Sequence, residues 1–141
     1  MTHPADDFEA LLRHAYAQFR AAGAAGSSTA PFAVVVGGDE ACAAFGLVDP
    51  PPIFWDAVEA LLFTLRHGAS SGAYRAVGYC GADLFNLPTD HRRHYALHAH
   101  LEHRLGDAAD YVLALDQPIP DPLRYEDWIR VEGDRQIFGI P

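Results

Sequence analysis

Five of the eight histidines in this chain lie within residues 91–103, and the backbone conformation of that segment decides which side chains can act together. Successive side chains of a β-strand point to opposite faces of a sheet. Residues 94–104 fit this alternation, because most odd-numbered positions are apolar and the positions between them hold polar side chains: His94, His98, His100, Glu102 and Arg104. A helix also fits the sequence, and it would align His94, His98 and Glu102 at a spacing of four.

The residues that follow favour a strand over a helix. A turn signal, Gly106-Asp107, separates residues 94–104 from residues 109–115, which continue the apolar alternation. Two alternating runs joined by a glycine-containing turn are typical of a β-hairpin. We therefore predict a hairpin whose polar face, including the histidines, is exposed to water or to a partner.

Two other segments have the apolar pattern of helices. In residues 7–22, apolar side chains recur every three or four positions, which predicts an amphipathic helix with one face on a core. Prolines 50–52 precede a second helical pattern, residues 53–66, at a place where proline favours helix initiation. Apolar side chains cover most of the circumference of this second helix, so we expect it to be buried on more than one side.

Short runs rich in β-branched or aromatic residues predict the remaining strands. Residues 31–36 and 41–48 flank a Gly-Gly-Asp turn and should form a hairpin. Residues 74–80 should form a further strand, followed by a long loop up to the histidine segment. Near the C-terminus, residues 128–132 and 135–140 have the pattern of a terminal hairpin.

These elements follow one another in the order helix, two strands, helix and three strands. An antiparallel sheet of about five strands with two helices packed on it is an α+β architecture. The chain has 141 residues, which is close to the commonest domain size and enough to bury one core. No linker or internal repeat divides the sequence, and we predict a single α+β domain over residues 1–141.

The charge balance argues against several kinds of partner. With 19 acidic residues against ten basic ones the formal net charge is −9, so phosphate backbones and anionic membranes would be repelled. All ten basic residues are arginine, which excludes a Schiff-base lysine and the lysine of a phosphate-binding P-loop. The N-terminus holds acids where a secretory signal holds bases, and no apolar run approaches the roughly 18 residues of a membrane span. We expect a cytoplasmic protein that binds neither nucleic acid nor membrane.

Two features have part of the pattern of a nucleophile site. Ser70 lies in a Gly-x-Ser-x-Gly sequence, but the hydrolase elbow needs a strand before the serine and a helix after it, which is the reverse of the predicted order. Cys80 would lie near His94 if their strands paired antiparallel, as in thiolate catalysis. We favour a structural role in both cases and expect Cys80 and Cys42 to be small buried thiols.

Three segments also resemble a known family. The stretch Tyr74–Cys80, the run Leu101–Arg104 followed by Gly106, and the closing run Gly133–Phe138 look like a family of small uncharacterised bacterial proteins. The resemblance covers roughly the C-terminal half of the chain. It implies that Leu101–Arg104 lies in a strand leading into a tight turn, and it implies no established activity.

Two functions from different classes fit these residues. Neutral imidazole is the commonest transition-metal ligand. A metal-dependent hydrolase would hold zinc or another divalent ion, with an open position for water, through His98 and His100 with Glu102 or His94 as the third ligand. The other interpretation makes these side chains the polar face of a sheet. We favour the latter and expect a non-enzymatic binding or interaction domain that forms a homodimer; the sequence identifies no small-molecule ligand.

The histidine segment also predicts a pH dependence of stability. Basic residues outnumber acidic ones within it, so protonated imidazoles should repel one another. We therefore expect the folded-state pKa values of these histidines to be depressed, and stability to fall as the pH drops through about 6.5.

Overall fold

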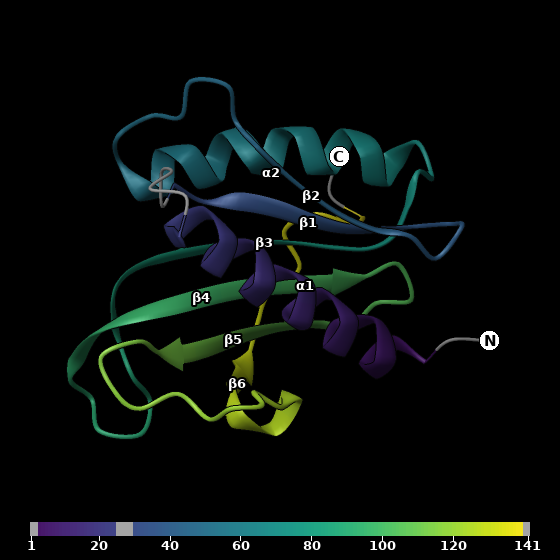
Figure 1. The fold of residues 1–141 in the computed structure, drawn as a ribbon. Helices are drawn as coiled ribbons and strands as arrows, with labels where there is room; N and C mark the ends of the chain where they lie inside the picture. Colours follow the sequence, from purple (N-terminus) through teal and green to yellow (C-terminus); the bar gives the residue numbers. More distant parts are fainter. Residues whose placement is uncertain (1–2, 25–29, 140–141) are drawn as a thin grey trace.

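A computed structural model describes residues 3–24 and 30–139 of the chain. Within these residues the predicted order of elements is confirmed, with one strand added after a short 3-10 helix (Figure 1). The helices are α1 (Pro4–Ala24) and α2 (Phe54–Ser70), and neither is long and apolar enough to cross a membrane. The other elements are β1 (Phe32–Gly37), β2 (Cys42–Gly46), β3 (Tyr74–Asn86), β4 (Arg93–His103), β5 (Ala108–Ala114), the 3-10 helix η1 (Tyr125–Asp127) and β6 (Ile129–Glu132).

The strands form one antiparallel sheet in the order β2-β1-β3-β4-β5-β6, so the predicted α+β fold class is confirmed. The predicted hairpin is β4 and β5, joined by a turn in which Gly106 has a φ of +114, a backbone conformation that suits glycine. The longest ladder joins β3 to β4 at the centre of the sheet. A side chain at Gly78 of β3 would collide with the backbone carbonyl of His100, so glycine permits this close approach.

The two helices cover opposite faces of the sheet. In Figure 1, α1 crosses in front of the strands and α2 lies at the top of the view. The core under α1 contains Phe8, Leu11, Leu12, Val34, Cys80, Leu97, Leu101 and Tyr111, and the core under α2 contains Val35, Val58, Leu61, Leu65, Val77 and Tyr79. Each helix has one apolar stripe and can cover one face only. The expectation of a solvent-exposed histidine face is therefore wrong, and His100 and Glu102 are fully buried.

The second helix is buried on one side rather than on several. Its stripe of Val58, Leu61 and Leu65 packs on the sheet, but Phe63 is 77% exposed and Trp55 is 51% exposed. The sequence pattern counted both aromatic rings as core, whereas Phe63 is largely exposed and Trp55 is half-exposed with its ring against Phe85 and His98 of the sheet. This leaves large apolar side chains on the surface of α2.

Two loop predictions are also corrected. Residues 81–86 continue β3 instead of starting a loop, because each of them pairs with a residue in the first half of β4. Near the C-terminus, β6 forms, but residues 133–139 do not return beside it as a second strand. They cross the α2 face, where Ile137 and Phe138 join the core, and Figure 1 shows this yellow segment passing behind the strands toward α2. Residue 140 of the predicted hairpin lies outside the described residues.

Candidate functional site

Two buried polar networks meet on β4, one on each face of the sheet. Because side chains alternate along a strand, His98, His100 and Glu102 lie on the α2 face, while Leu101 and His103 lie on the α1 face. We call the group His98, Asp110, His100 and Glu102 the His100 network. The group Asp7, Arg75 and His103 is the Asp7 network.

His100 is held between two carboxylates. Its Nδ1 lies 2.7 Å from Oδ1 of Asp110 on β5, and its Nε2 lies 2.7 Å from Oε2 of Glu102. The register pairs His100 directly with Asp110 across the β4–β5 ladder. A carboxylate can only accept, so both ring nitrogens donate and the ring is an imidazolium.

The pKa values in this network agree with that geometry. Burial alone would lower the pKa of His100, but the hydrogen bonds to Asp110 and Glu102 outweigh burial and raise that pKa to about 9. Burial would raise the pKa of Asp110, and the hydrogen bonds from His100 and His98 instead lower it to about 2. The pKa of Glu102 is also lowered, because hydrogen bonds from His100 and from backbone N–H groups outweigh the effect of burial.

The carboxylate of Glu102 also fastens the C-terminal segment to the sheet. Its oxygens accept the backbone N–H groups of Gln136 at 2.6 Å, Ile137 at 3.0 Å and Phe138 at 3.1 Å. The Nε of Arg66 on α2 donates to the carbonyl of Gln136 at 2.7 Å. The turn that residues 136–138 make therefore places three backbone donors around one buried anion, as in the backbone nests that bind anions.

The Asp7 network fastens the N-terminal helix α1 to the other face of the sheet. Arg75 of β3 donates through Nε and Nη2 to the two oxygens of Asp7, at 2.9 and 2.8 Å. Nε2 of His103 lies 2.8 Å from Oδ2 of Asp7, and its Nδ1 accepts the backbone N–H of Leu105. Burial would raise the pKa of Asp7, but these hydrogen bonds lower it. A bidentate arginine pair thus fixes the first turn of α1.

His98 occupies an aromatic setting at the end of the His100 network. The rings of Phe85, Tyr79 and Trp55 surround its imidazole, with centroids at 5.2, 5.8 and 6.3 Å. Its Nε2 lies 3.3 Å from Oδ1 of Asp110. Its Nδ1 is buried and has no hydrogen-bond partner among the described residues.

The four predicted ligand residues do not form one group. The structure brings His98, His100 and Glu102 together on one face, but His94 lies near the other end of β4, where its ring contacts Asp90 and Asp116. Hydrogen bonds that His94 donates to these two carboxylates raise its pKa. No group of three or more His, Cys, Asp or Glu side chains in the described residues has the geometry to hold a metal ion. A metal on His100 would have to displace one of its carboxylate partners, and the metal site stays a prediction.

Three residues of these networks were not identified from the sequence: Asp110, Asp7 and Arg75. Asp110 carries a usable signal, since it is a lone acid in an otherwise apolar run and faces the same side as His100 once the hairpin register is known. Asp7 and Arg75 lie 68 positions apart, and no local pattern links them.

Cys80 and Ser70, for which a structural role was expected, contact only structural neighbours within the described residues. Cys80 is fully buried, which raises the pKa of its thiol, and it pairs with Ala99 and not with His94. Cys42 is only partly buried. Ser70 is the last residue of α2, and its hydroxyl donates to the carbonyl of His67.

Comparison with protein-family models, with curated proteins and with solved structures finds no match for this chain. The resemblance to small bacterial proteins therefore stays a prediction. What the two networks do is structural. Buried, hydrogen-bonded charges attach both ends of the described chain to β4.

We predict that stability falls as the pH rises from about 6.5 to 9. The folded-state pKa of His100 is about 9 and thus above its unfolded value near 6.5, so its contribution is complete below about 6.5 and lost as the pH rises through 9. This reverses the sign expected from the sequence, because acids from other segments surround the histidines. Denaturant unfolding should give a free energy of unfolding that is lower at pH 9 than at pH 6 by on the order of 3 kcal/mol.

Two variants test the assignment to His100. The variant His100→Gln should be less stable at pH 6 and should lose most of the dependence between pH 6 and 9, whereas His94→Gln, on the same strand, should lose only the smaller part that the raised pKa of His94 contributes. An unchanged pH dependence in His100→Gln would refute the imidazolium assignment.

Proposed function

We propose that this chain is a non-enzymatic interaction domain that forms a homodimer through the outer surface of α2. The observation that carries the proposal is the exposure of Phe63, a large apolar side chain that is 77% accessible in the single chain. Trp55 and Ile53 add 51% and 61% exposed apolar side chains at the N-terminal end of the same helix. Large apolar side chains left exposed on the surface of one helix are a feature of association sites.

The polar residues around Phe63 support a second copy of the chain as the partner. The helical period places one outward stripe on α2: Asp56, Glu59, Phe63, His67 and Ser70. Glu59 and His67 are equally far from Phe63 in the sequence. An antiparallel pair of α2 helices related by a two-fold axis at Phe63 would therefore set each Glu59 beside His67 of the second copy. Such self-complementarity is what an isologous interface requires.

A metal-dependent hydrolase or other metalloprotein remains the second candidate. One observation supports it: His98, His100 and Glu102 share one face, and Nδ1 of His98 has no partner among the described residues. A cytoplasmic location is proposed from the two free cysteines, since thiols stay reduced in that compartment. A bacterial origin rests on the family resemblance, and exclusion of nucleic acid and membranes rests on the net charge.

The dimer is tested by light scattering across a range of protein concentrations. The average mass should rise from that of one chain toward that of two, and Phe63→Glu should weaken the association at least about tenfold, because it places a charge in the centre of the interface. Leu105→Glu is the matched control, since Leu105 is 65% exposed but lies in the β4–β5 turn. A monomer at every concentration would contradict the proposed dimer.

The two candidate functions are separated by metal analysis of protein purified without an affinity tag. If the chain is an interaction domain, the purified protein should contain no stoichiometric metal, and a chelator should not change its melting temperature. Stoichiometric zinc or another divalent ion that is lost in His98→Gln, but kept in His94→Gln, would instead establish the metalloprotein.

A further inference from the structure

The two edges of the sheet differ in their protection against pairing with another strand. At one edge, β6 has four residues and carries Arg130 and Glu132. At the other edge, β2 has five residues, Cys42–Gly46, with no charge and no proline. Edge strands are normally shielded by charges, proline or bulges, because their free backbone groups pair readily with other chains. β2 has none of these devices.

The hairpin register shows which backbone groups β2 offers. Gly37 donates its N–H to the carbonyl of Ala41, so every second residue from Ala41 onward bonds to β1. The residues between them turn their N–H and C=O groups outward: Cys42, Ala44 and Gly46. This edge therefore offers a ladder of backbone donors and acceptors to an added strand.

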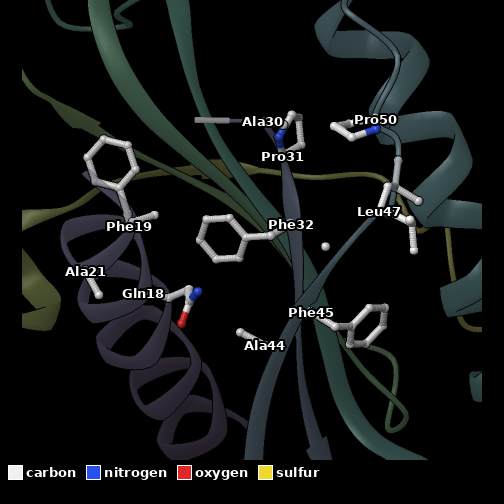
Figure 2. Close-up of a pocket in the computed structure, with 13 residues that line it drawn as sticks. Gln18, Phe19, Ala21, Ala30, Pro31, Phe32, Ala44, Phe45, Leu47 and Pro50 are labelled. Carbon is white, nitrogen blue, oxygen red and sulfur yellow. The ribbon is translucent and has the colours of Figure 1, made fainter. Parts of the chain in front are cut away.

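An apolar groove runs beside this edge. It has a volume of about 550 Å³, within the range typical of ligand sites. Figure 2 shows Phe19 of α1 on one side of the groove and Phe32 and Ala44 of the sheet on the other. Phe45 and Leu47 lie across the β1–β2 pair, so apolar side chains are available on both faces of an added strand.

Charges at the two ends of β2 decide between possible occupants. Exposed Asp39 lies in the hairpin turn before β2, and exposed Asp49 follows β2. If a second copy paired antiparallel with its two-fold axis at Ala44, Asp39 of each copy would face Asp49 of the other. Like charges opposite each other destabilise a strand pair. Basic residues at both ends of a foreign strand would instead be attracted.

We propose that the β2 edge and its groove bind an extended segment of a partner protein that has alternating apolar residues flanked by arginine or lysine. The segment adds a seventh strand to the sheet, and its apolar side chains enter the groove. This mode of recognition takes affinity from backbone hydrogen bonds and specificity from side-chain pockets. The inference deepens the proposed interaction function, but it uses a surface separate from the α2 dimer interface.

The test uses a set of fluorescent ten-residue peptides of alternating valine, leucine or phenylalanine with threonine, each carrying two arginines at both ends. A matched set carries glutamates there. Anisotropy should show saturable binding of at least one arginine-flanked peptide, at least tenfold tighter than its glutamate-flanked counterpart. Asp49→Arg should reduce this preference at least threefold. On binding, hydrogen exchange at the amides of Ala44 and Gly46 should slow in the unaltered protein.

Ala44→Pro removes one outward donor and leaves the bonds to β1 intact, because proline is tolerated where the N–H faces out of a sheet. It should weaken peptide binding at least tenfold, whereas Phe63→Glu should bind the peptides as well as the unaltered chain.

The proposal is overturned if no peptide binds, or if binding leaves the Ala44 and Gly46 amides unprotected. It is also overturned if Ala44→Pro abolishes dimerisation while Phe63→Glu does not, since a second copy would then occupy β2. Loss of dimerisation in Phe63→Glu with peptide binding retained separates the two proposals.

Discussion

The buried carboxylate of Glu102 and the neighbouring imidazole of His103 tie the two ends of the described chain to one point on the central strand β4. Glu102 faces α2 and accepts three backbone N–H groups from residues 136–138, while His103 faces α1 and contacts Asp7. Removing one partner from such a buried, paired charge costs about 3–5 kcal/mol, because the other charge is left without compensation. Two adjacent residues thus fasten the first helix and the last segment onto opposite faces.

His100 explains how Glu102 can stay ionised in the core. Without a cation beside it, a buried carboxylate would take up a proton and hold backbone donors less strongly. The imidazolium supplies that cation, and Asp110 on the other side keeps the imidazolium charged. The two surfaces proposed for association, the outer stripe of α2 and the β2 edge, hold none of the residues of the His100 network.

Local patterns predicted much of the fold and little of the site. Alternation in residues 94–104 and 109–115 identified the β4–β5 hairpin, and the spacing of Phe8, Leu11 and Leu12 identified α1, because these signals depend only on neighbouring residues. The burial of His100 depends on Tyr79, whose ring stacks on the imidazole, and on the C-terminal segment, which binds Glu102 beside it. The sign expected for the pH dependence is also reversed, because Asp110 of β5 and Glu102 of β4 both hydrogen-bond His100 and raise its pKa.

Hydrogen exchange in two matched carboxylate variants, Glu102→Ala and Asp7→Ala, tests this attachment most directly. In Glu102→Ala the amides of Ile137 and Phe138 should exchange at least about tenfold faster, while those of Leu11 and Leu12 in α1 change little. In Asp7→Ala the amides of α1 should accelerate and those of residues 137 and 138 should not. If either variant accelerated both chain ends equally, or if Ile137 and Phe138 stayed as protected in Glu102→Ala as in the unaltered chain, the account would be contradicted.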